Sequence, residues 1–357
     1  MYHSLTSLMT DPHNQSPLKL NVDQSTPEGK VISGSLASST GGTYPVSRGI
    51  PRFTAVGDAG QHQTENSFGY KWNRLDSFDS PAMVQFARNW LVEKYGFKDA
   101  DAMRDFFASR KRILDAGCGA ALSSSTFVDE EWRKKSESNQ TEWCGVDIST
   151  AIDVAQARLG AIDRTHFVQA DLLALPFKSG TFDTIFSEGV LHHTPSTKKA
   201  LLATADLLAP GGEFLFYVYR KKGPIREFTD DYIRDEIAGM DPNEAWESLR
   251  SLTELGQALA ELKVDVTVPS DIPMLGIKAG KIDIQRFIYW NVAKMFWNPD
   301  LAFEENHHIN FDWYHPRYAH RQTAEEVQQW CEEANLTIHY LKAEEAGLTV
   351  RAVKRAA

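Results

Sequence analysis

The chain has 357 residues, enough for one large domain or two, and its apolar content of 42% is sufficient for a packed core. Its formal net charge of -10 argues against nucleic acid as the main partner, because phosphate binding normally requires a basic stripe. The three cysteines have no metal-like or disulfide-like spacing, and no apolar run approaches the ~18 residues that span a bilayer. We therefore expect a cytoplasmic protein with no membrane partner.

The amino-terminal part of the chain divides at about residue 30. Residues 1–30 are rich in Ser, Thr, Asn, Asp and Pro and lack a hydrophobic period, so we predict a flexible tail. Residues 31–53 are typical of two short strands around a turn, followed by an extended arm, and they open a small β module over residues 31–65. Residues 66–74 follow, and their aromatic side chains Tyr70 and Trp72 either contact a ligand or anchor the arm to the core.

Residues 112–119 form the centre of the predicted core. The apolar residues Ile113 and Leu114, bounded by Lys111 and Arg112, predict a short buried strand. Asp115-Ala-Gly-Cys-Gly then predicts a tight turn that enters a helix over residues 120–127. Because glycine has no side chain, a ligand can approach its backbone closely. Glycine also adopts backbone dihedral angles that other residues cannot adopt. The start of a helix would add free N–H groups with partial positive charge. Amphipathic helices are predicted before this strand, over residues 81–95 and 100–109.

Three more strand-like runs follow, and each ends at acidic or small polar residues. The first ends at Asp147, the second at Asp171 and the third at Glu188, which precedes His192 and His193. A further run over residues 213–219, with apolar character on both faces, predicts a buried parallel strand. In an open parallel sheet these strand ends meet at one edge, where ligands bind.

These motifs resemble the class I S-adenosylmethionine-dependent methyltransferases. The matching segments are Ile113-Leu-Asp-Ala-Gly-Cys-Gly, Gly145-Val-Asp-Ile-Ser, Gln169-Ala-Asp-Leu-Leu-Ala-Leu-Pro-Phe, Phe182-Asp-Thr-Ile-Phe-Ser-Glu-Gly-Val-Leu-His-His and Leu207-Leu-Ala-Pro-Gly-Gly-Glu-Phe-Leu-Phe. The resemblance implies an α/β protein with a Rossmann-like, doubly wound, seven-stranded sheet whose last strand is antiparallel. It also implies S-adenosyl-L-methionine as cofactor, bound by Asp115, Gly117, Cys118, Gly119, Asp147, Ile148, Asp171, Leu172 and Glu188.

Within this resemblance, the amino-terminal module is similar to the zinc-ribbon-like module that precedes some bacterial methyltransferases. Tyr44-Pro-Val and Gly49-Ile-Pro-Arg-Phe carry the likeness, but Ala37 and Thr40 occupy the positions of the ribbon's cysteines. Neither side chain binds zinc as a thiolate does, so we expect a metal-free relic.

His192 and His193 are the candidate catalytic residues, because they follow the strand that faces the reacting centre in the family and neutral imidazole suits general-base work. The alternative is that one of them caps the following turn. Glu188 could instead hold a substrate amine, and a nucleophilic role for Cys118 is not needed, since methyl transfer requires no covalent enzyme intermediate.

Residues 66–220 form the predicted core, and residues 221–321 form a mostly helical lid inserted after the fifth strand, with helices over 227–237, 244–262 and 282–297. Residues 322–357 complete the core with a helix and a strand pair, and Thr323 and Glu326 form a capping box. The dense polar and aromatic stretch 304–321 could bind substrate, anchor the lid or hold a metal; we expect no metal. The substrate-binding candidates are Tyr70, Trp72, Tyr217, Tyr314, His315, Tyr318, His320 and Arg321.

We therefore predict a methyltransferase that acts on the oxygen or nitrogen of a small molecule, as a monomer or homodimer, in a specialised-metabolite or sugar pathway. A rival hypothesis is an NAD(P)-dependent oxidoreductase, although residue 122 is leucine where a dinucleotide loop would have a third glycine. Two more hypotheses are a protein that binds S-adenosylmethionine without catalysis and, against the acidic balance, a nucleic-acid methyltransferase.

Overall fold

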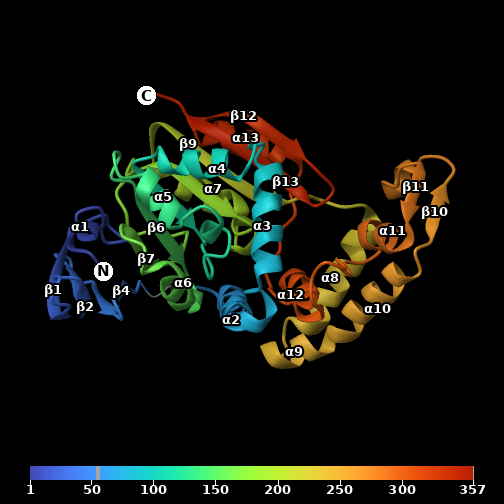
Figure 1. The fold of residues 1–357 in the computed structure, drawn as a ribbon, viewed down its shortest axis with the longest axis horizontal. Helices are drawn as coiled ribbons and strands as arrows, with labels where there is room; N and C mark the ends of the chain where they lie inside the picture. Colours follow the sequence, from blue (N-terminus) through green and yellow to red (C-terminus); the bar gives the residue numbers. More distant parts are fainter. Residues whose placement is uncertain (54–56, 357) are drawn as a thin grey trace.

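The computed structural model describes residues 1–53 and 57–356; residues 54–56, part of the predicted 31–65 module, and residue 357 lie outside the described part (Figure 1). Its centre is a seven-stranded sheet with the order β12-β13-β9-β8-β5-β6-β7. The strands are β5 (Arg112–Ala116), β6 (Glu142–Asp147), β7 (Thr165–Gln169), β8 (Phe182–Glu188), β9 (Leu208–Tyr219), β12 (Leu336–Ala343) and β13 (Gly347–Lys354). Strands β5 to β9 pair in parallel, and β13 is antiparallel to both of its neighbours. The predicted fold class is confirmed.

Helices cover both faces of this sheet, as a doubly wound fold requires. Along β9, Phe214 and Phe216 belong to one buried cluster and Leu215 to another, because successive side chains of a strand point to opposite faces. The first cluster includes residues of α7 (Thr197–Asp206) and α13 (Ala324–Glu333). The second includes residues of α3 (Pro81–Lys94), α4 (Ala100–Ala108), α5 (Glu130–Lys135) and α6 (Ala151–Leu159).

Helix α13 begins as its sequence predicts. Thr323 Oγ1 accepts a hydrogen bond from the Glu326 N–H at 3.2 Å, and Glu326 Oε2 accepts one from the Thr323 N–H at 2.8 Å. This reciprocal capping box satisfies two N–H groups that a helix start leaves without partners. The predicted start of the closing helix is confirmed.

The amino-terminal residues are ordered, so the prediction of a flexible tail over residues 1–30 is wrong. They contain α1 (His3–Thr6) and β1 (Leu18–Ser25), and β1 opens an antiparallel sheet with β2 (Val31–Ser38), β3 (Thr43–Ser47) and β4 (Ile50–Pro51). Leu5 and Met9 are each 1% exposed and pack into the same core as the main sheet. Arg52 Nη2 donates to Asp153 Oδ1 at 2.7 Å and ties this sheet to α6. The likeness to a zinc ribbon stays a prediction.

The lid forms a separate lobe beside the sheet (Figure 1). It consists of α8 (Pro224–Ile237), α9 (Pro242–Ser248), α10 (Arg250–Glu261), β10 (Asp265–Val268), β11 (Gly280–Asp283), α11 (Ile284–Asn291) and α12 (Phe303–Tyr314). The helix predicted over 244–262 is divided at Leu249, and the one predicted over 282–297 ends at Asn291. Helix α12 contacts α2 (Ala59–Asn73), which contains most of the predicted arm 66–74. Among the described residues, no helix is both long and apolar enough to cross a membrane.

Candidate active site

A cavity of about 510 Å³ lies at the carboxyl ends of the parallel strands and extends under the lid. Its volume is in the range of cofactor and small-molecule pockets, about 300–1,000 Å³. All nine residues predicted to bind the cofactor line it: Asp115, Gly117, Cys118, Gly119, Asp147, Ile148, Asp171, Leu172 and Glu188. They meet because parallel strands present their carboxyl ends at one edge of the sheet.

The loop after β5 requires glycine at two positions. Gly117 has φ +86°, and a Cβ there would lie 2.1 Å from Val190 Cγ1. Gly119 has φ +53°, and its Cβ would lie 2.8 Å from Trp72 Nε1. Each site therefore combines a left-handed backbone with a space that excludes any side chain.

The helix predicted over residues 120–127 is wrong. Ala121 has φ 56°, and only a short 3-10 turn, Ser124–Thr126, follows it. The loop's own N–H groups are already paired: the Gly117 N–H donates to the Val146 carbonyl at 2.8 Å and the Gly119 N–H to Asp147 Oδ2 at 2.9 Å. The loop therefore shapes the cavity by its backbone path, without a helix N-terminus directed at the ligand.

Asp147 is held in one orientation by its neighbours. Its Oδ1 accepts hydrogen bonds from the Ser149 N–H at 2.8 Å and the Ser149 hydroxyl at 2.7 Å, while Oδ2 accepts the Gly119 N–H. Burial raises the pKa of Asp147, and these hydrogen bonds oppose that rise. The carboxylate retains lone pairs for a ligand diol, because three hydrogen bonds use only part of its capacity.

Asp115 is a buried carboxyl group whose charge depends on pH near neutrality. Ser124 Oγ donates to its Oδ2 at 2.5 Å. Burial raises the pKa of Asp115 to about 7, with the Ser124 hydrogen bond opposing the rise and the charge of Asp147 adding to it. A ligand ammonium beside Asp115 would therefore bind best when this carboxyl is ionised.

Asp171 lies under the amino-terminal end of α2. Its Oδ1 accepts the Leu173 N–H at 2.9 Å, and its Oδ2 accepts Gln61 Nε2 at 2.7 Å. Gln61 was not among the predicted site residues, and it lines the same cavity. Helix α2 thus closes the cavity over Asp171 as well as over Gly119.

Glu188 is engaged by two side chains from the carboxyl end of α3. Lys94 Nζ donates to Glu188 Oε1, and the Tyr95 hydroxyl donates to Oε2 at 2.6 Å. Burial lowers the pKa of Lys94 to about 7, and the negative charge of Glu188 opposes this change. Both carboxylate oxygens of Glu188 therefore have protein partners, and Lys94 also lies 3.0 Å above the centre of the Tyr217 ring.

The two candidate histidines have different surroundings. His193 lines the cavity, and its Nδ1–H donates to the Tyr318 carbonyl at 2.5 Å, which leaves Nε2 as the nitrogen with a lone pair. Nε2 has no hydrogen-bond partner among the described residues. His192 is fully buried and lies outside the cavity lining; the centre of its ring is 3.7 Å from the centre of the Tyr219 ring. The prediction of His192 as a base is therefore wrong, because no acceptor in the cavity can reach it.

Trp72 and Tyr217 line the cavity, but the other six predicted substrate-binding residues do not. Tyr70 donates its hydroxyl to Asn243 at 3.1 Å on a separate surface, and Tyr314 donates its hydroxyl to the buried Asp230 at 2.8 Å. His315 pairs with Ser67 Oγ at 2.8 Å. These predictions are wrong because the side chains hold the lid together.

The remaining three predicted substrate residues are likewise structural. The Tyr318 hydroxyl donates to Asp58 Oδ2 at 2.8 Å, and Arg321 Nε donates to Glu227 Oε2 at 2.8 Å. The His320 N–H donates to the His192 carbonyl at 2.9 Å. All three lie outside the cavity lining and fasten the segment that follows α12 to the core and to α8.

Several residues absent from the predicted site line the cavity. Lys71 of α2 forms an ion pair with Asp312 of α12, and Asp312 Oδ2 also accepts the Tyr219 hydroxyl at 3.0 Å. Burial raises the pKa of Asp312, but the nearby Lys71 ammonium dominates and lowers it well below its ordinary range. The far wall of the cavity is formed by polar and aromatic residues of the lid: Lys222, Arg226, Arg286, Tyr289, Trp290 and Lys294. No local sequence pattern marks these positions, since they come from separate elements.

The sheet order, the glycine loop and the acids at consecutive strand ends together define the class I methyltransferase fold. The residues present fit S-adenosylmethionine: Asp147 offers a fixed carboxylate, and Asp115 an ionisable one. Gly189, with φ +74° and nothing within 4 Å of where a Cβ would lie, leaves open space beside them. Asp115, Asp147 and Asp171 would hold the amino-acid, ribose and adenine parts, respectively.

Comparison with known proteins supports this assignment. Residues 114–216 match the profile of a family described as a methyltransferase domain. S-adenosylmethionine is accordingly the cofactor. An uncharacterized protein of Synechococcus sp. is 38% identical over 118 residues, which is 32% of this chain and 27% of that protein.

A malonyl-[acyl-carrier protein] O-methyltransferase of Enterobacter lignolyticus is 31% identical over 121 residues, which is 33% of this chain and 44% of the enzyme. Thus the chain spans less than half the length of these two curated relatives. The structure of 1,6-didemethyltoxoflavin-N1-methyltransferase of Burkholderia thailandensis has 14% identity, a TM-score of 0.39, and coverage of 88% of this chain and 96% of its own. That score is too low to carry an argument.

Proposed function

We propose that the protein transfers a methyl group from S-adenosylmethionine to the oxygen or nitrogen of a small molecule. The observation that carries this proposal is one cavity whose lining includes the predicted cofactor residues, His193 and lid side chains. Bound S-adenosylmethionine supplies an electrophilic methyl group on a sulfonium. The chain's own task is then to align donor and acceptor and to exclude water.

His193 is the proposed base. Its Nδ1–H is fixed on the Tyr318 carbonyl, so its Nε2 can accept a proton from an acceptor hydroxyl or ammonium. Burial lowers the pKa of His193 to about 4, with the charge of Asp312 opposing this change. The imidazole is therefore neutral at physiological pH and ready to accept a hydrogen bond.

The lid over residues 221–321 is the proposed substrate-selecting part. Helices α8, α11 and α12 supply polar and aromatic side chains to the cavity wall opposite the sheet. Aromatic rings exclude water from a bound acceptor, and a small number of polar groups orient it. This proposal includes four of the predictions made from the sequence. They are a small-molecule partner, no nucleic-acid partner, a monomer or homodimer, and a cytoplasmic location.

The test is to incubate the protein with S-adenosylmethionine and a panel of hydroxy- and aminoarenes, and to measure S-adenosylhomocysteine and methylated products by mass spectrometry. We expect a product with at least one acceptor, and we expect His193→Asn to lower kcat about 10²–10⁴-fold without changing the affinity for S-adenosylhomocysteine. Cofactor binding without turnover on any acceptor would favour a non-catalytic protein. Binding of NADH instead would favour the oxidoreductase.

A further inference from the structure

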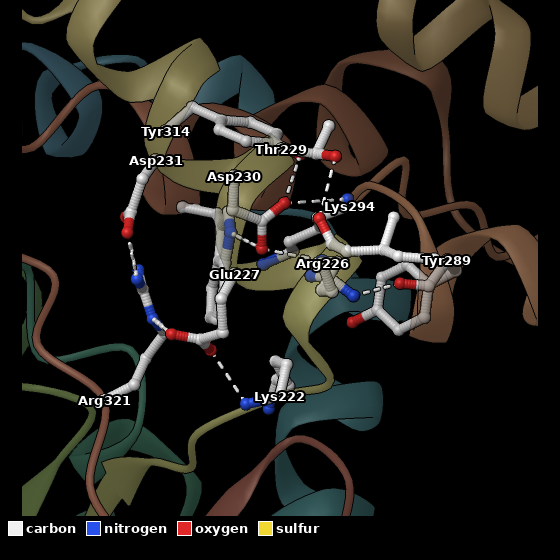
Figure 2. Close-up of polar contacts among 12 residues, drawn as sticks. Lys222, Arg226, Glu227, Thr229, Asp230, Asp231, Tyr289, Lys294, Tyr314 and Arg321 are labelled. Carbon is white, nitrogen blue, oxygen red and sulfur yellow. Dashed lines mark hydrogen bonds and ion pairs between the residues drawn. The ribbon is translucent and has the colours of Figure 1, made fainter. Parts of the chain in front are cut away.

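Three cationic side chains converge at the lid end of the cavity, and we call them the lid cation cluster: Lys222, Arg226 and Lys294 (Figure 2). All three surround the Trp313 ring, with Lys222 Nζ 5.8 Å, Arg226 Cζ 5.3 Å and Lys294 Nζ 4.8 Å from its centre. They come from the segment before α8, from α8 itself and from the segment after α11. The fold thus gathers positive charge from distant parts of the chain onto one wall.

Of the three cations, Arg226 alone has an ion-pair partner among the described residues. Lys294 is 6% exposed, and its Nζ has neither an ion pair within 4.0 Å nor a hydrogen-bond partner among the described residues. Within the same described ranges, Lys222 Nζ contacts only main-chain carbonyls, those of Glu345 and Ala346. By contrast, Lys71 of the cavity wall pairs with Asp312, and the buried Lys94, outside the cavity lining, pairs with Glu188.

Arg226 shares its one close carboxylate with other donors. Its Nε donates to Asp230 Oδ2 at 2.6 Å, and the same carboxylate accepts the Trp313 indole N–H at 2.8 Å and the Tyr314 hydroxyl at 2.8 Å. Figure 2 shows the Asp230 carboxylate beside Arg226 and Lys294, where it also accepts the Lys294 main-chain N–H at 3.2 Å. Asp230 therefore balances Arg226, and the two lysines remain without a partner charge in the part of the chain that the structure describes.

Most of the other acids near the cluster have donors of their own. Glu227 accepts from Arg321 and from the Lys222 main-chain N–H, and Asp312 is paired with Lys71. In the loop between β12 and β13, Glu344 and Glu345 also line the cavity; Glu344 pairs with Lys342 at 2.9 Å, and Glu345 is exposed. The pKa values of Lys222 and Lys294 are lowered to about 7 each, chiefly by burial and in part by the charge of Arg226. The charge of Asp230 opposes this change at both lysines, and that of Asp312 opposes it at Lys294.

An unpaired ammonium in a buried site is costly, and a bound anion would remove that cost. Lysine and arginine are the side chains that bind carboxylate and phosphate oxygens most strongly. Tyr289, Trp290 and Phe296 line the same end of the cavity and provide an apolar wall for the body of a ligand. We propose that the lid cation cluster binds an oxyanion, a carboxylate or a phosphate, carried by the methyl acceptor. This inference rests on the proposed function and names the substrate class of the same site.

The test measures anion binding by titration calorimetry in the presence of saturating S-adenosylhomocysteine. The probes are benzoate, phenyl phosphate and the neutral benzamide, so that the first two separate a carboxylate from a phosphate. We expect at least one anion to bind at least tenfold more tightly than benzamide. Lys294→Met should abolish this preference, whereas Lys281→Met should keep it, because Lys281 lies on exposed β11, is paired with Asp265 at 2.8 Å and is absent from the cavity lining.

Two further readouts keep the test decisive. Lys294→Met removes a buried, unpaired charge, so its thermal unfolding midpoint should equal or exceed that of the wild type. Anion binding at pH 8 should take up protons, because binding raises the depressed pKa values of Lys222 and Lys294, and this uptake should decrease in Lys294→Met. No preference for either anion, or a preference that survives Lys294→Met, would overturn the proposal while S-adenosylhomocysteine binding still supported the methyltransferase function. Absence of S-adenosylhomocysteine binding would instead overturn the proposed function.

Discussion

Gly117→Ala tests whether the loop after β5 needs glycine for the two reasons that the structure gives. A side chain at φ +86° costs about 1–2 kcal/mol, and overpacking a filled site costs about 1–3 kcal/mol more. The new Cβ would lie 2.1 Å and 2.6 Å from the two Val190 methyl carbons, so Val190 or the loop must move. We therefore expect a loss of about 2–5 kcal/mol in the free energy of unfolding.

The assay is urea unfolding followed by fluorescence, together with titration of S-adenosylhomocysteine. Gly211→Ala is the matched control, because Gly211 has φ +77° but no atom within 4 Å of a Cβ, so it should lose only the strain of about 1–2 kcal/mol. Gly117→Ala should also lose cofactor affinity, whereas Gly211→Ala should keep it. Equal stability of the two variants would refute the steric part of the reasoning.

Three other predictions concern charged and titratable groups. Because burial raises the pKa of Asp115 to about 7, affinity for S-adenosylhomocysteine should fall as pH decreases through 7, approaching tenfold per unit, and Asp115→Asn should abolish that dependence. In the protein without ligand, the buried Asp115 carboxyl is destabilising when it is ionised. Asp115→Asn should therefore raise the thermal unfolding midpoint more at pH 8 than at pH 5. Lys71→Met leaves Asp312 as an uncompensated buried charge and should cost about 3–5 kcal/mol in urea unfolding, most of it recovered in Lys71→Met/Asp312→Leu. The pKa of His193 is about 4, so its imidazole stays neutral above pH 6. In initial-rate measurements, protonation of His193 should therefore cause no change in kcat above that pH.

Each of these has an outcome that contradicts it. Cofactor affinity that is flat from pH 5 to 8 would show that Asp115 does not face the ligand ammonium. A double variant as unstable as Lys71→Met alone would show that the loss comes from packing, without a contribution from the unpaired charge. A fall in kcat between pH 8 and pH 6 that disappears in His193→Gln would show that His193 titrates far above the expected value.

The sheet and the cofactor residues could be predicted because their signals are local. Short apolar runs that end in acids mark β5 to β8, and parallel pairing then brings Asp115, Asp147 and Asp171 to one edge. The prediction for the chain around Leu18 is wrong for the opposite reason. Leu18 and Leu20 alternate with polar residues over only a few positions, and the partner that orders them, β2, becomes apparent only in the folded sheet.

The substrate end of the cavity could not be predicted in this way. The stretch 304–321 is rich in aromatic and polar residues, but Tyr314 and His315 point toward α8, α2 and the Met240 carbonyl that follows α8. Lys222 and Lys294 are separated by most of the lid, and each looks like an ordinary surface lysine in its own segment. Only the folded structure shows that the half-buried Lys222 and the buried Lys294 lie near the same Trp313 ring.

Cofactor binding by Asp147 is the central feature of the proposed site. The decisive measurement is titration of S-adenosylhomocysteine into the wild type and Asp147→Ala, with the exposed Asp163→Ala as control. We predict saturable one-site binding in the wild type and in Asp163→Ala, and its loss in Asp147→Ala, since this carboxylate is fixed by Ser149 and Gly119 at the cavity wall. No binding to the wild type, or equal binding to Asp147→Ala, would contradict the account.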